Sequence, residues 1–137
     1  MRASTALVLV ASALIASCAT HSDKPRRELL VGQWQHKVEV FGDSRTSDWA
    51  FSNDGSFLLT GYSEPRGMRV SYVPERGAWT LNGSTLELRY LPAGQTKEAP
   101  PEAKTEIRRI VKLTAAEFVS ADATFGIELA YSRVNLQ

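Results

Sequence analysis

The dominant pattern after residue 28 is a strict alternation of apolar and polar residues. In residues 31–41 one face carries Trp34, His36, Val38 and Val40, with polar residues between them. Similar short segments follow at 46–52, 56–61, 68–73, 77–81, 85–90, 105–113, 117–121 and 125–133. Alternation predicts half-buried strands, because successive strand side chains point to opposite faces. We therefore expect about eight strands and little helix, limited to one turn near residues 28–30.

Turn signals separate these segments. Asn53-Asp54-Gly55-Ser56 and Asn82-Gly83 each lie between apolar runs, and Asn-Gly in this position is a strong hairpin signal. Hairpin-length connections predict an all-β fold, an eight-stranded antiparallel up-and-down β-barrel, whose closure removes exposed sheet edges. A small β-sandwich with Greek-key connections is the alternative, and it would suit the irregular stretch at 65–77.

The first 18 residues differ from the rest. Arg2 precedes an apolar run at 6–16, which has signal-peptide length and is too short to span a bilayer. The run ends in Ile15-Ala16-Ser17-Cys18, a branched apolar residue, two small residues and a cysteine. This resembles the lipobox of bacterial lipoproteins. The resemblance implies lipid attachment to Cys18, cleavage before it and acylation of the new amino group.

The domain boundaries follow from this resemblance. We expect a signal peptide at 1–17, a lipidated Cys18 with a polar tether at 18–28, and a barrel domain at 29–137. Cys18 is the only cysteine, so it has no intramolecular disulfide partner. A secretory peptide with an incidental cysteine is the alternative. Acyl chains imply an anchor in the bacterial cell envelope, and Ala19 favours the periplasmic face of the outer membrane in a Gram-negative host.

Composition and charge exclude several classes of function. The chain has 16 Lys+Arg and 15 Asp+Glu, and Arg2 is the only charged residue before Cys18, so the part after the predicted cleavage has a net charge of 15 − 15 = 0. This argues against nucleic-acid binding. No His, Cys and carboxylate spacing suggests a metal site, and no phosphate loop is present. We therefore expect no catalytic residues, metal or cofactor, and no enzymatic activity.

Several segments, in order, resemble bacterial lipocalin-like domains. Gly32-Gln33-Trp34 matches their Gly-x-Trp opening, and residues 49–57 and 77–88 resemble their next hairpins. Residues 131–134 resemble the closing strand, whose Arg133 lies over the first-strand Trp34. The resemblance covers residues 29–134 and implies a structural role for Gly32, Trp34 and Arg133. The chain lacks the family's disulfide cysteines and its Thr-Asp-Tyr motif.

Two polar residues fall where alternation predicts apolar faces. His36 shares a face with Trp34, and Arg109 aligns with apolar residues of 105–113. Inside a barrel, His36 and Arg109, together with Tyr90 and Tyr131, would orient an anionic head group such as a carboxylate. The alternatives are that a register shift turns the two residues outward, or that they pair with the tyrosines.

Two functions fit this pattern. The leading interpretation is a lipid-anchored module that binds a small apolar or amphipathic ligand inside the barrel. Bulky inward residues would instead fill the barrel: Trp49, Phe51, Phe57, Leu59, Trp79, Leu88, Tyr90, Phe118 and Tyr131. A filled barrel would favour a protein-interaction or inhibitor module that contacts an envelope protein through the loops Glu64–Gly77 and Pro92–Ala103.

Overall fold

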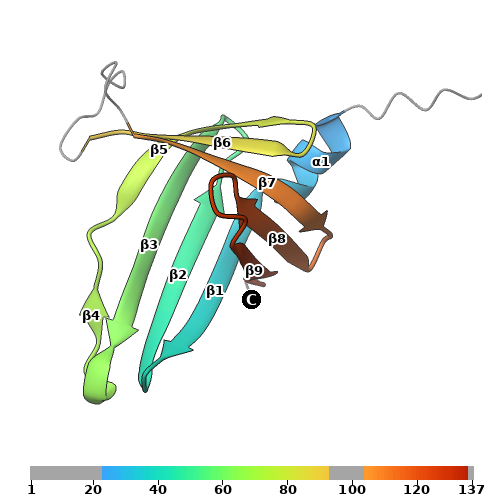
Figure 1. The fold of residues 1–137 in the computed structure, drawn as a ribbon. Helices are drawn as coiled ribbons and strands as arrows, with labels where there is room; N and C mark the ends of the chain where they lie inside the picture. The colour runs from blue at the N-terminus through green and yellow to red at the C-terminus, as the bar shows by residue number, and fades with distance from the viewer. Residues whose placement is uncertain (1–22, 93–103, 136–137) are drawn as a thin grey trace, which may run out of the picture.

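The computed structural model describes residues 23–92 and 104–135 of the chain. One helix, α1 (Asp23–Leu30), precedes the strands (Figure 1). The strands are β1 (Gly32–Val40), β2 (Asp43–Phe51), β3 (Ser56–Glu64), β4 (Val70–Ser71), β5 (Glu75–Asn82), β6 (Thr85–Tyr90), β7 (Thr105–Leu113), β8 (Glu117–Asp122) and β9 (Glu128–Arg133). A single turn of 3-10 helix, Pro65–Gly67, lies between β3 and β4.

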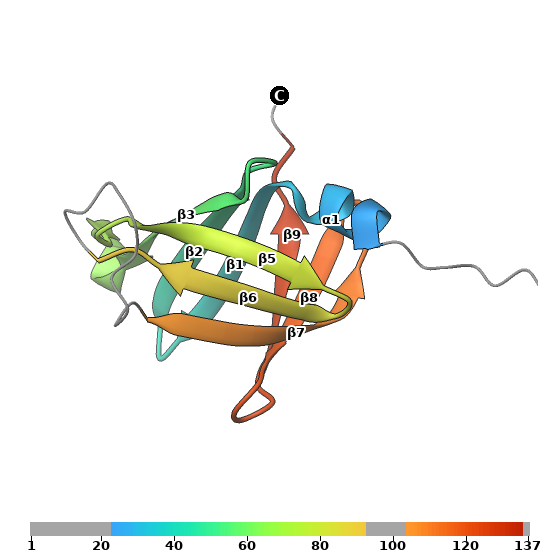
Figure 2. The ribbon, with the colours of Figure 1, turned by 90° about the horizontal axis from the view of Figure 1, so that it is seen from above.

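Eight of the strands form a closed antiparallel barrel (Figure 2). Pairing runs from β1 through β2, β3, β5, β6, β7 and β8 to β9, which returns to pair with β1. The two-residue strand β4 adds to the edge of β3. The predicted eight-stranded barrel is confirmed, and the β-sandwich alternative is wrong. Closure pairs the first and last strands of the barrel with each other at Trp34 and Gln35, where a sandwich would have two separate edges.

An aromatic core fills the part of the barrel nearest α1. The buried core residues are Leu30, Trp34, Trp49, Phe51, Phe57, Trp79, Leu86, Leu88, Tyr90, Ile110, Phe118 and Tyr131. The rings of Phe118 and Tyr131 stack with centroids 4.5 Å apart, and Trp34 meets Phe118 edge-on at 5.3 Å. Such pairs add about 0.5–1.5 kcal/mol each beyond the burial of their area. Of the predicted bulky inward residues, only Leu59 is half-buried rather than buried.

Helix α1 and the closing strand cap this end. The indole N–H of Trp34 donates to the Leu30 carbonyl at 2.8 Å. The guanidinium carbon of Arg133 lies 4.2 Å from the centre of the Trp34 ring, a cation–π contact. Gly32 has a φ of +135°, and a Cβ there would lie 2.3 Å from the Arg133 guanidinium. Only glycine fits at this position.

The helix begins earlier than the sequence predicts. The Arg26 guanidinium donates to the Gly83 carbonyl at 3.2 Å and to Ser84 Oγ at 3.0 Å, and Arg27 donates to the Asn53 carbonyl at 3.0 Å. The prediction of a tether over the whole of residues 18–28 was therefore wrong for 23–28, because these arginines bind the ends of distant hairpins. None of the described helices is long and apolar enough to cross a membrane. The predicted signal peptide and Cys18 lie outside the described residues.

Candidate functional site

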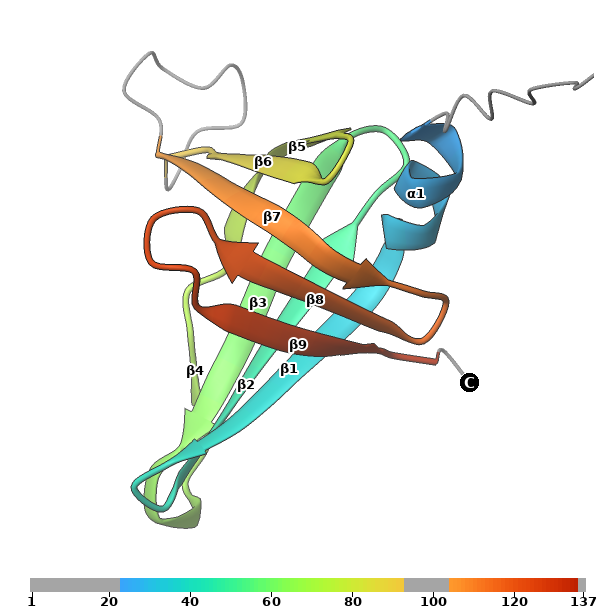
Figure 3. The ribbon, with the colours of Figure 1, turned by 45° about the vertical axis from the view of Figure 1, so that its right-hand side comes forward.

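We call the barrel end opposite α1 the open end. Strands β1, β2 and β3 continue past the other strands as a curved ribbon (Figures 1 and 3). A pocket of 200 Å³ lies here, lined by Ser47, Leu59, Thr60, Tyr72, Val73 and Glu75. Ser47 lies two residues from Trp49 on the inward face of β2, and Leu59 lies two residues from Phe57 on the inward face of β3, so the pocket lies next to the aromatic core.

A buried charged cluster lies on the inward faces of β6, β7 and β8. Arg108 donates to Glu106 Oε1 at 2.6 Å and to Ser120 Oγ at 2.7 Å, and the Tyr90 hydroxyl donates to Glu106 Oε2 at 2.8 Å. Arg108 is only 7% exposed and Ser120 is fully buried, whereas the Glu106 side chain is 23% exposed. Burial, and then the hydrogen bond to Glu106, raise the pKa of Tyr90, so its hydroxyl remains a donor at neutral pH.

Two more charged residues connect this cluster to the open end. Glu75 lines the pocket, and its negative charge also raises the pKa of Tyr90. Lys104 Nζ lies 4.5 Å from the centre of the Tyr90 ring. Tyr90 therefore lies among two negative residues, Glu75 and Glu106, and two positive ones, Lys104 and Arg108, whose charges sum to −2 + 2 = 0. This balance gives neither a cationic nor an anionic head group a net electrostatic advantage.

The predicted inward position of Arg109 was wrong. Arg109 is exposed, while Arg108 and Ile110 are buried. The apolar residues expected to share an inward face with Arg109, Ile107 and Val111, are also exposed. A register shift between Ile110 and Lys112 then returns Leu113 to the inward side. A bulge reverses the faces to which the following residues of the strand point, and the alternation of the sequence does not reveal where a bulge lies.

The other predicted site residues lie on inward faces of the barrel. The ring of His36 lies 5.3 Å from that of Tyr131, and His36 Nδ1 is 2.7 Å from the Ala130 carbonyl oxygen. This contact assigns the proton to Nδ1. Tyr131 is buried in the core, and burial raises the pKa of its hydroxyl. The structure thus brings Tyr90 to Arg108, leaves Arg109 outside, and engages His36 with the backbone of β9.

Sequence reasoning missed Glu106, Arg108 and Ser120. One signal was available, because in a regular strand two consecutive arginines, Arg108 and Arg109, must point to opposite faces. In either register, one of the two arginines must therefore face inward. Glu106 lies two residues before Arg108 and so shares its face, which offers the buried guanidinium a carboxylate partner.

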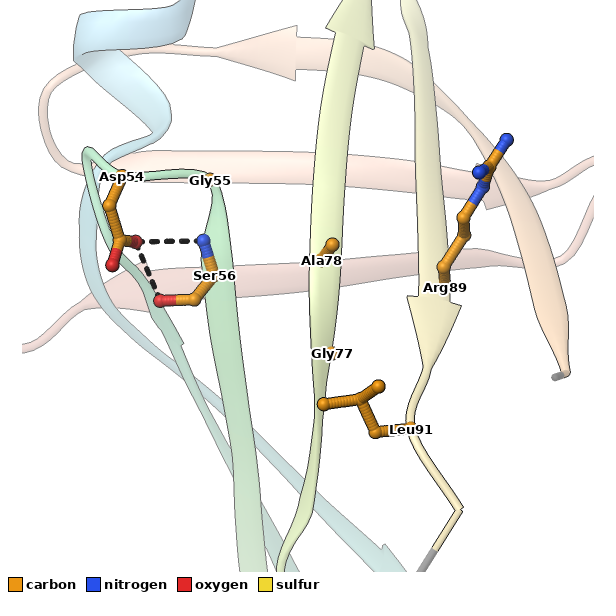
Figure 4. Close-up of a pocket in the computed structure, with 7 residues that line it drawn as sticks. All are labelled: Asp54, Gly55, Ser56, Gly77, Ala78, Arg89 and Leu91. Atoms are coloured by element: carbon orange, nitrogen blue, oxygen red, sulfur yellow. Dashed lines mark hydrogen bonds between the residues drawn. The ribbon is translucent and has the colours of Figure 1, made fainter. Parts of the chain in front are cut away.

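A larger pocket lies on the outer surface. It has a volume of 560 Å³ and is lined by Asp54, Gly55, Ser56, Gly77, Ala78, Arg89 and Leu91 (Figure 4). The Asp54 carboxylate accepts hydrogen bonds from Ser56 Oγ at 2.6 Å and from its backbone N–H at 2.8 Å, and these lower the pKa of Asp54. Arg89 lies on the far side of Ala78 and donates to Glu87 at 2.7 Å. The polar groups are thus engaged with neighbours rather than directed at a common point.

Within residues 23–92 and 104–135, no group of three or more His, Cys, Asp and Glu side chains is arranged to hold a metal ion.

Comparison with known proteins supports the fold. The crystal structure of a lipocalin-like protein from Bacteroides uniformis matches with a TM-score of 0.50 and 17% sequence identity, over 77% of this chain and 99% of that chain. No protein-family model matches the sequence, and no curated protein is significantly similar to it. At this identity the similarity is informative about the fold alone. The chain therefore has a lipocalin-like β-barrel.

Proposed function

We propose that this chain is a lipid-anchored protein of the bacterial cell envelope whose barrel binds a small apolar or amphipathic ligand at its open end. The observation that carries the proposal is the charged cluster of Arg108, Glu106 and Tyr90 inside the barrel, together with Glu75, which lines the open-end pocket and acts electrostatically on Tyr90. A buried ion pair contributes little net stability, so a structural role explains Arg108 poorly. Ligand sites typically combine apolar walls with a few convergent polar groups.

The pocket limits the size and the charge of the ligand. Its 200 Å³ is below the roughly 300–1,000 Å³ of sites for drug-sized ligands, so either the ligand is small or only one end of it enters. The charges around Tyr90 sum to zero, and the charged residue that lines the pocket is Glu75, so the site favours an uncharged polar head over the carboxylate that Arg109 suggested. The rest of a longer ligand would extend along the inner face of the β1–β3 ribbon.

Acylation of Cys18 supplies the membrane anchor in this proposal. Only residues 19–22 separate Cys18 from the start of α1, and five residue steps reach at most about 18 Å. The α1 end would therefore lie near the membrane, with the open end at the far side of the barrel (Figure 1). In this orientation the ligand enters from the aqueous side.

A titration with the uncharged fluorescent probe aminoanthracene tests the binding proposal. The protein is the chain from Ala19 onward, without its acyl chains. We expect saturable binding to one site, weakened in Arg108→Gln and unchanged in the matched control Arg109→Gln. Ser47→Phe fills the pocket without touching the charged cluster, and it should abolish binding while circular dichroism shows an intact fold. Unchanged binding in Ser47→Phe would rule out this pocket.

The packed core supports a second candidate function, a protein-interaction or inhibitor module. In the described residues every buried side-chain polar atom has a hydrogen-bond partner, so the core needs no ligand to complete it. The loop Glu64–Gly77 exposes Met68, Val70 and Val73 as its contact surface. Residues 93–103 of the other predicted contact loop, Pro92–Ala103, lie outside the described residues. Failure of the probe to bind would favour this candidate.

A further inference from the structure

Strand β1 has one edge that is only partly paired. On one side, all nine of its residues pair with β2. On the other side, pairing with β9 involves only Trp34 and Gln35. Beyond Gln35, no strand in the described part of the chain pairs with this edge, and Figure 3 shows the lower part of β1 running past β9. An exposed edge of this kind is a template for another strand.

The backbone groups at this edge belong to Lys37 and Glu39. Val134 N–H donates to the Gln33 carbonyl at 2.9 Å, so Gln33 directs its backbone groups toward β9. Backbone direction alternates along a strand, so Lys37 and Glu39 direct their N–H and C=O groups the same way. At His36 the two strands separate, and the imidazole rather than the backbone bonds to β9.

The sequence at this edge is complementary to itself. When two copies pair antiparallel about Val38, Lys37 faces Glu39 of the second copy, and symmetry forms the same pair again. Each is a hydrogen-bonded backbone pair with opposite charges on the outer face, which stabilises a sheet. Val38, which is 38% exposed, would meet Val38 of the second copy.

We propose that this edge joins two copies of the chain in a symmetric dimer, with residues 37–39 paired about a two-fold axis at Val38. Charges on an edge usually prevent pairing, but here they select one register. A shift of the second strand by two residues in either direction places Lys37 opposite Lys37, or Glu39 opposite Glu39, of the second copy. The dimer does not depend on ligand binding.

Sedimentation equilibrium of the chain from Ala19 onward tests the dimer. The interface is small, so we expect a dissociation constant between about 1 μM and 1 mM. Lys37→Glu or Glu39→Lys alone should abolish dimerisation, because each places like charges opposite one another. The double variant Lys37→Glu/Glu39→Lys restores opposite charges and should restore the dimer. A wild-type chain that remains a monomer at 1 mM, or a dimer insensitive to either single reversal, would overturn the proposal.

A disulfide cross-link tests the register. Cys18 is the only cysteine, so the chain from Ala19 onward has none. Val38→Cys places two thiols opposite each other, with Cα atoms about 4.5 Å apart, within reach of a disulfide. Val40→Cys lies opposite His36 of the second copy and serves as the matched control. We expect oxidation to double the mass of Val38→Cys only. Equal cross-linking of both variants would contradict this register.

Discussion

Arg108 donates to the Glu106 carboxylate at 2.6 Å inside a barrel whose other inward side chains are largely aromatic. The Arg108 guanidinium also donates to Ser120 Oγ, and the Glu106 carboxylate also accepts from the Tyr90 hydroxyl, so each member of the ion pair has a further partner. A buried pair of this kind tolerates the loss of one member poorly, because the remaining charge then lacks compensation. Arg109, by contrast, is exposed, so the two neighbouring arginines should differ in their contribution to stability.

The first prediction compares these two arginines. Arg108→Ala should lower the free energy of unfolding by about 3 kcal/mol, because it leaves Glu106 without its partner. Arg109→Ala changes an exposed side chain, so its free energy of unfolding should stay within about 0.5 kcal/mol of the wild-type value. Denaturant unfolding monitored by tryptophan fluorescence measures both. Equal losses would contradict the position of β7 described here.

The second prediction concerns the closed end of the barrel. Gly32→Ala should destabilise the fold by more than Gly42→Ala. Both glycines have positive φ, +135° and +82°, but only at Gly32 would a Cβ clash with a neighbour, the Arg133 guanidinium. The strain of a left-handed conformation alone costs about 1–2 kcal/mol, and Gly42→Ala reports that cost. Similar urea unfolding midpoints for the two variants would show that the clash with Arg133 causes no further loss of stability.

The third prediction is a loss of stability at alkaline pH. The pKa of Tyr90 is raised in the folded state, so above about pH 10 the unfolded chain releases this proton while the folded chain keeps it. The unfolded state then binds fewer protons, and stability falls as the pH rises. Tyr90 contributes up to about 1.4 kcal/mol per pH unit to this slope.

The Tyr90→Phe variant isolates that contribution. Below pH 9 the free energies of unfolding of the variant and the wild type should differ by a constant amount, because the variant lacks the hydrogen bond to Glu106. Above pH 10 the variant's stability should fall less steeply. Unfolding free energies measured between pH 7 and 12 that remain parallel throughout would argue against a raised pKa.

The fourth prediction concerns the anchor. Cys18→Ala should abolish incorporation of an alkyne-labelled palmitate in the bacterial host, because the thiol that accepts the lipid is absent. The protein should also leave the membrane fraction. Ser17→Ala keeps a small residue before the cysteine and is the matched control, in which labelling continues. Labelling that persists in Cys18→Ala would remove the lipoprotein assignment.

The sequence was sufficient to predict most of the barrel. Asn53–Ser56 and Asn82-Gly83 form the expected turns between β2 and β3 and between β5 and β6. Alternation identified the inward aromatic residues because period two is a local property of a strand. The cation–π contact of Arg133 with Trp34 lies where the resemblance placed it.

Features that depend on distant contacts could not be predicted in this way. The start of α1 depends on Arg26 bonding to Gly83 and Ser84, 57 and 58 residues away. The charged cluster depends on the register of β7, which turns Arg108 rather than Arg109 inward, and on Ser120 from the neighbouring strand. The open-end pocket depends on how the irregular segment 72–75 packs against β2 and β3.

An NMR titration with octanol tests the central claim most directly, with octanoate as the charged counterpart. The account predicts saturable shifts of backbone amides around the open end, at Ser47, Tyr90 and Glu106, and weaker binding of octanoate. The amides of the outer pocket, at Ser56 and Ala78, should not move. Shifts confined to the outer pocket, or none at all, would contradict a ligand site at the open end of the barrel.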